Sequence, residues 1–482
     1  AGNTAVGKNC LDANTTASDN TAVGEDALTT VITGTRNSAL GVGALQLNTA
    51  SDNVAVGYHA LDTNAGGSEN TAVGTEAMDR NTSGDSNTAV GYRALDSNTT
   101  ANNNVAIGKA ALGLNTTGTT NTALGALSLD ANTTANDNTG IGAASMGGNT
   151  TGTRNTAVGS DSLKVSTTGN DNVAIGKGAL TANTSASNNT AVGKNGLAAN
   201  TTGANNVAVG YHAGTAVTTG LQNTLIGMDT GNALTDADFN VAVGTDALGA
   251  DTLGSKSVAI GRRALFSQNF TSATDALNVG IGFEAGNDLT TGLTNTLIGS
   301  ICHDNLTEGS LNTALGYNLA PSAVDVDSEI VIGSSITGAG TNTVRIGTGG
   351  GTATLGLDGS DTSWAAASDS RLKKDVADST VGLSFLNDLR PVTFKWNAKN
   401  EVAEDLPQYD ADSSDPIFGE GKAHHGFIAQ EVKSVIDDHS DVLDGNNIWH
   451  EDPDGTQQLS QGNLVPMLVK AVQELSAKIA EL

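Results

Sequence analysis

Residues 87–95 read Asn-Thr-Ala-Val-Gly-Tyr-Arg-Ala-Leu, and versions of this stretch fill most of the 482-residue chain. The pentapeptide Asn-Thr-Ala-Val-Gly also begins at Asn3, Asn20 and Asn70. Related pentapeptides begin at Asn37, Asn53, Asn104, Asn121, Asn138, Asn155, Asn172, Asn189, Asn206, Asn223, Asn240, Ser257, Asn278, Asn295, Asn312, Glu329 and Asn342. The step is 17 residues almost throughout, with about four extra residues between Arg262 and Ala276. Self-similarity at a fixed period predicts a solenoid, here of about 21 units.

Each unit has the composition of a short strand followed by turns. Within the pentapeptide, Thr and Val face one side of a strand, and Asn, Ala and Gly face the other. A second apolar piece, such as Ala27-Leu28, and a turn, such as Asn98-Thr99-Thr100, complete the unit. Frequent Gly and Asn disfavour a helix. We therefore expect a mainly β chain, a parallel β-roll in which each unit is one flattened coil with two short strands and two turns. Stacked about 4.8 Å apart, the coils would make a solenoid roughly 100 Å long.

The residue types suit a narrow coil. The recurrent Ala fits a thin interior, and the Gly fits a tight bend. An Asn repeated in register can form a ladder of hydrogen bonds along the stack. The Val, Ile or Leu beside the Ala points outward, so we expect that face to pack against something as well. A coil this thin buries little apolar area, and the pattern therefore favours an oligomer.

The repeat Asn-Thr-Ala-Val-Gly-x-x-Ala-Leu resembles the head repeat of trimeric autotransporter adhesins over roughly residues 1–350. The resemblance implies left-handed parallel β-rolls packed as trimers, although the heads of that family usually have shorter repeats. Stacked Asn and Thr are interpreted mainly as structural, with a flat ice-binding or sugar-binding Thr face as the alternative. Five aromatic and histidine residues follow the Gly in equivalent places and are expected on an exposed rim, with a receptor patch as the alternative: Tyr58, Tyr92, Tyr211, His59 and His212.

Composition excludes several other classes of protein. The formal net charge of −28 argues against binding to nucleic acid or to anionic membranes. No apolar run is long enough to span a membrane, so no membrane insertion is expected. Cys10 and Cys302 are too few for a disulfide framework. Calcium-binding solenoid repeats do not occur, and no metal or other cofactor is predicted. The chain opens in mid-pattern without a signal segment, which we interpret as a truncated N-terminus.

The composition changes after about residue 350. We expect repeats over 1–347, a Gly/Thr/Ser-rich neck or linker over 348–367, and a small α+β domain over 368–482. In this domain, 392–396 alternates as a strand and 427–436 has helical spacing. Residues 464–482 are predicted to form a coiled-coil helix with the heptad seam Val465, Leu468, Val472, Leu475, Ile479 and Leu482. A lone amphipathic helix is the alternative to a threefold bundle.

The start of this domain holds a serine and a lysine that could act together. Residues 367–374 read Ala-Ser-Asp-Ser-Arg-Leu-Lys-Lys. A serine hydroxyl is a poor nucleophile unless a base takes its proton, and a lysine serves as that base only when burial or a nearby cation lowers its pKa. Arg371 and Lys374 are such cations beside Lys373. The alternative is that Ser368 simply caps a helix.

Three ordered motifs and the terminal coiled coil resemble the intramolecular chaperone auto-processing domain of phage tail spikes, tail fibres and endosialidases. The motifs are Ser-Asp-Ser-Arg-Leu-Lys over 368–373, Leu-Arg-Pro-Val-Thr-Phe-Lys-Trp over 389–396, and Gly-Phe-Ile-Ala-Gln-Glu-Val over 426–432. Members of that family trimerise, guide the folding of an upstream β-structured fibre, and then cut themselves off.

The resemblance also implies the residues of the cleavage site. Ser368 matches the nucleophile of the family and Lys373 its general base. Cleavage is implied between Ala367 and Ser368, and Asp369 and Arg371 match positions to which we give structural or orienting roles. The enzyme activity expected is therefore a single self-cleavage rather than turnover of a substrate by the repeats.

The expected function is a homotrimeric fibre, either a phage tail fibre or a surface adhesin, that binds a glycan or an outer-surface protein of a host cell. The expected location is the virion tail or an extracellular surface. His424 and His425 are accessory candidates for catalysis, with a surface or loop role favoured. The alternatives are a glycan-degrading tail spike, which needs paired carboxylates and aromatic platforms, and an ice-binding or purely structural filament.

Overall fold

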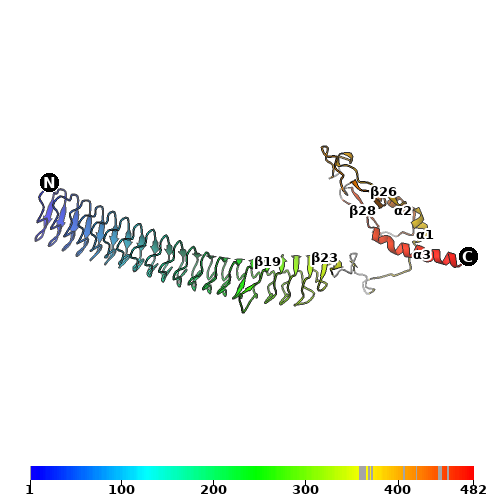
Figure 1. Cartoon of the computed structure of the whole chain (residues 1–482), viewed down its shortest axis with the longest axis horizontal. Helices are drawn as coiled ribbons and strands as arrows, with labels where there is room; N and C mark the ends of the chain where they lie inside the picture. The colour runs from blue at the N-terminus through cyan, green and yellow to red at the C-terminus, as the bar shows by residue number, and fades with distance from the viewer. Residues whose placement is uncertain are drawn as a thin grey trace. The chain divides into compact units, whose positions relative to one another are not determined.

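The computed structural model describes residues 2–357, 365–366, 370, 373–404, 408–418, 421–442, 448–452 and 455–481. The chain separates into two compact units, Ala1–Ala367 and Ser368–Leu482. Each unit has a hydrophobic core of its own. The first unit is a solenoid, whose coils succeed one another from the N-terminus to β23 in Figure 1.

The solenoid contains one continuous parallel sheet, as the repeat pattern predicts. Its strands are β1 (Thr4–Val6), β2 (Thr21–Val23), β3 (Ser38–Leu40), β4 (Val54–Val56), β5 (Thr71–Val73), β6 (Thr88–Val90), β7 (Val105–Ile107), β8 (Thr122–Leu124), β9 (Thr139–Ile141), β10 (Thr156–Val158), β11 (Val173–Ile175), β12 (Thr190–Val192), β13 (Val207–Val209), β14 (Thr224–Ile226), β15 (Val241–Val243), β17 (Val258–Ile260), β19 (Val279–Ile281), β20 (Thr296–Ile298), β21 (Thr313–Tyr317), β22 (Ile330–Ser334) and β23 (Thr343–Thr348). Each strand pairs in register with the strand of the next coil, so that Ala89, for example, lies between Ala72 and Ala106. The mainly β solenoid of 17-residue repeats is thereby confirmed.

The prediction of two strands in every coil is wrong, because the second apolar piece lies in turns. Ala27 and Leu28 are completely buried, but Leu28 has a φ of 52° and Asp26 a φ of 58°, so the backbone bends in the left-handed region instead of extending. A second parallel pair forms in the described solenoid where the extra residues enter, between β16 (Gly254–Ser255) and β18 (Thr274–Asp275).

The repeated Asn side chains form the predicted ladder, but they bond mainly to backbone rather than to one another. Asn87 is buried. Its Oδ1 accepts from the backbone N–H of Asn104 at 2.9 Å, and its Nδ2 donates to the carbonyl of Ala101 at 2.8 Å. Each such Asn therefore satisfies backbone groups that the turns of a thin coil would leave unpaired.

Interior volume is conserved where the repeat varies. Gly214 and Gly231 replace the buried Leu of their coils, and the central Ala of the intervening strand β14 becomes Leu225. A Cβ at either Gly would lie within 3 Å of the Leu225 side chain, so the larger residue fills the vacated space. This exchange keeps the interior close-packed.

The solenoid ends in antiparallel strands. β24 (Gly351–Gly356) pairs along the whole of β23, and β25 (Ala365–Ala366) pairs with β24. The segment expected to be a neck or linker, 348–367, therefore contributes strands to the sheet of the solenoid.

The second unit mixes short strands and helices, as the sequence predicts for an α+β domain. Its elements are α1 (Leu383–Asp388), β26 (Val392–Phe394), η2 (Lys399–Glu401), β27 (His424–Gly426), α2 (Ala429–Asp438), β28 (Trp449–Glu451), β29 (Gln457–Leu459), η4 (Gln461–Leu464) and α3 (Val465–Ala480). The two strand pairs β26–β27 and β28–β29 are antiparallel. The core of the unit gathers around Phe385 of α1, Val432 of α2 and Leu464 of η4.

Candidate functional site

Most of the predicted cleavage site lies outside the described residues. This applies to Ala367, Ser368, Asp369 and Arg371. Lys373 is described and exposed, and its backbone N–H donates to the carbonyl of Ser370 at 3.2 Å. The predicted pairing of Ser368 with Lys373 therefore stays a prediction.

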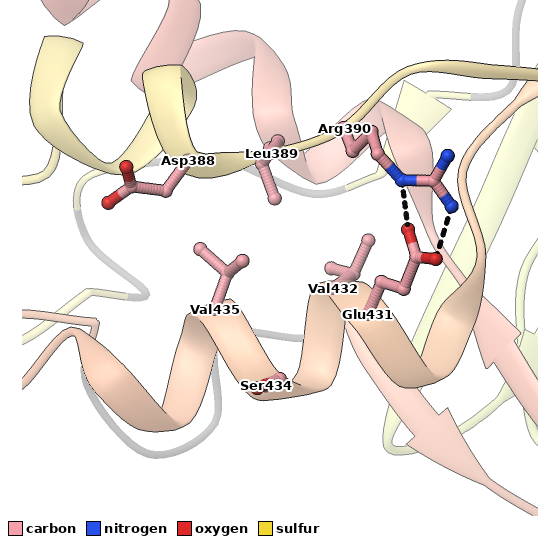
Figure 2. Close-up of a pocket in the computed structure, with 7 residues that line it drawn as sticks. All are labelled: Asp388, Leu389, Arg390, Glu431, Val432, Ser434 and Val435. Atoms are coloured by element: carbon pink, nitrogen blue, oxygen red, sulfur yellow. Dashed lines mark hydrogen bonds and ion pairs between the residues drawn. The ribbon is translucent and has the colours of Figure 1, made fainter.

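The second and third sequence motifs, in contrast, are brought together. Arg390 follows α1, and Glu431 lies in the first turn of α2. The Arg390 guanidinium donates from Nε to Glu431 Oε2 at 2.9 Å, and from Nη2 to Oε1, as Figure 2 shows. Beside this cation, the pKa of the Glu431 carboxyl is held below its usual range. Both side chains are largely exposed, so the pair fixes orientation more than it adds stability.

A small cavity of about 240 Å³ lies beside this ion pair. Asp388, Leu389 and Val435 line it together with the two charged residues (Figure 2). His439 Nε2 lies 2.8 Å from Asp388 Oδ2, and its ring meets the buried Phe385 edge to face. These contacts tie the end of α1 to the end of α2.

A strand pair joins the same two motifs a second time. Val392 of β26 pairs with Gly426 of β27, and Phe394 pairs with His424. The ring centroids of Phe394 and His424 are 5.7 Å apart. His424 is thus packed within the strand pair, while His425 is exposed on it. No described contact gives either histidine a catalytic role.

Helix α3 has one packed face and one exposed face. Ala471 is buried, and Glu474 accepts the backbone N–H of Leu383, at the start of α1, at 3.0 Å. The predicted seam lies on the other face, and five of its residues are 47–65% exposed: Val465, Leu468, Val472, Leu475 and Ile479. Leu482 lies outside the described residues. The heptad seam is therefore not used by the helix's own domain.

The solenoid also carries an exposed apolar stripe. In strands such as β6 and β7 the central Ala points inward, and the residue after it points outward, as predicted. Large side chains exposed at this outward position are Val6, Leu40, Ile107, Leu124, Ile175, Ile226, Ile260 and Leu315. Because the coils are in register, these side chains lie in one row with the partly buried Val or Ile of the strands between them. Long exposed apolar rows are typical of surfaces that a partner covers.

Of the five residues predicted on an exposed rim, the three tyrosines are exposed, whereas His59 and His212 are half-buried. Tyr58, Tyr92 and Tyr211 are each about half exposed. The ring of Tyr211 stacks on His212, and Arg93 lies over the ring of Tyr92.

One group of described side chains has metal-ligand spacing, although the sequence predicts no metal. Ligand atoms of His59, Asp62 and Asp79 lie within 4.8 Å of one another. His59 Nδ1 lies 2.8 Å from Asp62 Oδ2, and this hydrogen bond accounts for the arrangement of two of the three. We assign no metal to this cluster.

The second unit also has a groove of about 730 Å³, which the sequence does not predict. Its walls come from segments far apart in the chain, including β26, β27 and β29. The only feature of the sequence that points to the groove is its aromatic residues Phe394, Trp396 and Phe418, whose rings are in contact.

In the described part of the chain, no helix has both the length and the apolar character needed to cross a bilayer.

Comparison with known proteins identifies part of the second unit. Neither the curated proteins nor the solved structures yielded a match to the chain. Residues 368–441 match a peptidase family model described as the chaperone of endosialidase. The match begins at the predicted nucleophile and contains both motifs that Arg390 and Glu431 join. It supports the intramolecular chaperone domain expected from the sequence at the C-terminal end of the chain.

Proposed function

We propose that the chain is one protomer of a homotrimeric fibre, a phage tail fibre or a surface adhesin, whose C-terminal domain aligns three chains and then cuts itself off. One observation carries this proposal. A chaperone domain match starts at residue 368, where the unit that contains the solenoid ends. In this proposal the C-terminal domain assists the folding of the solenoid, and the solenoid attaches to a receptor on the host cell.

The trimer is supported by the two exposed apolar surfaces. The outward stripe of the solenoid and the seam of α3 both present aliphatic side chains that the single chain leaves exposed. Burying a Val, Leu or Ile side chain contributes about 1.5–3 kcal/mol. A 3-4 spacing on one helix face is the pattern of a coiled coil.

The repeats explain why such a fibre needs a chaperone. Neighbouring coils pair through nearly identical strands, so a chain displaced by one coil finds almost the same contacts. Three chains that stack with different offsets would be trapped in misfolded states. A C-terminal domain that trimerises first fixes the offset at zero.

The proposed cleavage is an attack of Ser368 on the preceding peptide bond. Ser368 Oγ bonds to the carbonyl carbon of Ala367, the C–N bond breaks, and the Ser368 nitrogen leaves as an amine. Lys373 takes the hydroxyl proton and returns it to that nitrogen, and water then hydrolyses the ester. Lys373 is exposed in the single chain, and a lysine becomes a base when it is buried or lies beside another cation, so the proposal is that assembly of the trimer encloses it. Cleavage therefore follows trimer formation.

Receptor attachment is assigned to the solenoid. A glycan or an outer-surface protein is the proposed partner, and the exposed rim residues Tyr58, Tyr92 and Tyr211 offer aromatic faces for it.

Substitution of the proposed nucleophile tests the cleavage. The natural chain should give two fragments on a denaturing gel, and Ser368→Ala should give only full-length chain, a loss of at least about a hundredfold in rate. Lys373→Arg, which keeps the charge but cannot act as a base, should do the same. Ser370→Ala is the matched control and should cleave normally. Persistence of a fragment ending near Ala367 in the Ser368→Ala chain would show that the serine assignment is wrong.

A further inference from the structure

The groove in the second unit differs in chemistry from the rest of that unit. Trp396 and Phe418, which are 39% and 52% exposed, have ring centroids 5.0 Å apart and form one wall. Phe427 and Leu459 add apolar surface. None of the lining residues is Asp, Glu, Lys or Arg, although the surrounding domain is rich in them. The groove therefore favours an uncharged ligand.

Amide groups complete the lining. The side chains of Gln408, Gln430 and Gln461 reach the groove, and within the described residues none of them makes a hydrogen bond. Each amide offers a donor and an acceptor. They can bond the polar groups of a ligand whose apolar parts lie on the aromatic rings.

Two short strand pairs flank the groove. β26–β27 contributes Phe394 and His425, and β28–β29 contributes Gln457 and Leu459. Each pair is a sheet of two strands in the described structure, and neither is joined to the other. Edge strands present unpaired backbone N–H and C=O groups that an extended peptide can complete. A peptide is thus favoured over a sugar, because a sugar has no backbone amides that could pair with a strand edge.

We propose that this groove binds extended, uncharged segments of the repeat type Asn-Thr-Ala-Val-Gly before they stack into coils. The inference rests on the proposed chaperone function and names the segments on which the domain acts. The repeat pentapeptide has no charge, its Ala and Val suit the aromatic wall, and its Asn and Thr suit the amides. In a folded coil the backbone of the same segment is already paired to its neighbours. Stacking therefore releases it from the groove.

Binding of a repeat peptide to the full-length Ser368→Ala chain tests this proposal. The probe is a fluorescent peptide of residues 188–193, Asn-Asn-Thr-Ala-Val-Gly, measured by anisotropy. We expect saturable binding, and a loss of at least about tenfold when Val in the peptide is replaced by Glu. Phe418→Ala should weaken binding about tenfold as well. Tyr409→Ala removes an aromatic residue of the same segment that does not line the groove, and should leave binding unchanged.

A second variant separates loss of the groove from loss of the fold. Gln461→Glu places a charge in the groove without removing an aromatic residue, and should also weaken binding, while thermal unfolding matches that of the parent chain. Equal binding to Phe418→Ala, or binding of neutral maltohexaose in place of the peptide, would overturn the proposal. Absence of peptide binding in a chain that still forms trimers would refute only this inference, whereas absence of trimers would refute the proposed function.

Discussion

A single histidine stands in the interior of the solenoid at a position that other coils give to Leu. His303 follows β20 and takes the place of Leu265 and Leu248, with the same left-handed backbone. It is completely buried, and neither ring nitrogen has a hydrogen-bond partner in the described structure. Burial lowers the pKa of His303 to about 4 from its ordinary value of 6.5, and the buried carboxylate of Glu329 acts in the opposite direction. The imidazole is therefore neutral in the folded coil.

Because His303 is buried and neutral, we expect the solenoid to lose stability in acid. An unfolded chain takes up a proton at His303 below pH 6.5, whereas the folded chain does so only near pH 4. Stability is therefore fully present above pH 6.5 and falls as the pH drops from 6.5 to 4, by about 3 kcal/mol per chain. His303→Leu should raise the thermal midpoint and flatten its decline over this range. Calorimetry at several pH values measures both effects.

The control for this prediction is His450→Leu. The side chain of His450 is mostly exposed and belongs to the second unit, so its replacement should leave the thermal midpoint of the solenoid unchanged. An unchanged pH dependence in His303→Leu would contradict the assignment of the acid sensitivity to this residue.

At the scale of the coil, the Gly that follows a strand such as β6 cannot be replaced without a steric clash. Gly91 has a φ of 134°, and a Cβ there would lie 2.6 Å from the carbonyl oxygen of Gly108 in the next coil. Gly66 has an ordinary φ, and a Cβ there would meet only the carbonyl oxygen of Thr82 at 3.9 Å. Replacing Gly66 by Ala is therefore a suitable control for replacing Gly91 by Ala.

Gly91→Ala should destabilise the solenoid by at least about 2 kcal/mol per chain, because it adds both backbone strain and a collision with the next coil. Gly66→Ala should change stability by less than about 1 kcal/mol. Limited proteolysis should cut the Gly91→Ala chain near this coil first. Equal resistance of the two variants would show that the coils can separate to admit a Cβ.

The sequence predicted the strand of each coil but not its second half. Alternation in Asn-Thr-Ala-Val-Gly is enough to orient Ala inward and Val outward, since one face is a narrow interior. Leu28, however, adopts a left-handed backbone that is unfavourable for Leu. Only the stacking of many coils imposes it, and a local pattern carries no sign of stacking. The same holds for His303, whose residue type gives no hint of its burial.

For the candidate site, the sequence predicted the motifs but not the contacts between them. The motifs around Arg390 and Glu431 were found in the sequence, but their ion pair depends on how α1 and α2 pack. The groove could not be predicted, because segments from Phe394 to Gln461 build it jointly. Ser368 was predicted from the resemblance that three ordered motifs carry, and its position relative to Lys373 lies outside the described structure.

At the scale of the whole molecule, the exposed seam of α3 should control assembly. Val472 is 65% exposed and lies in the middle of the seam. In a threefold bundle, Val472→Glu would bring three carboxylates into one buried layer, at a cost of several kcal/mol per trimer. We expect the variant to give monomers in sedimentation equilibrium where the parent Ser368→Ala chain gives trimers.

The neighbouring Gln473 provides the control. It is exposed and lies outside the seam, so Gln473→Glu adds the same charge without entering the bundle and should leave the trimer intact. A monomeric parent chain, or a trimeric Val472→Glu chain, would contradict the role of the seam.

The antiparallel strands at the end of the solenoid have a consequence for the mature particle. Both β24 and β25 precede the proposed cut, so they stay with the solenoid when the C-terminal domain departs. The last parallel strand, β23, is then already hydrogen-bonded by β24, and the outermost strand, β25, is only two residues long. A sheet that ends in so short a strand offers few unpaired backbone groups to which a strand of another rod could pair. Released rods should therefore stay separate in suspension instead of joining end to end into filaments.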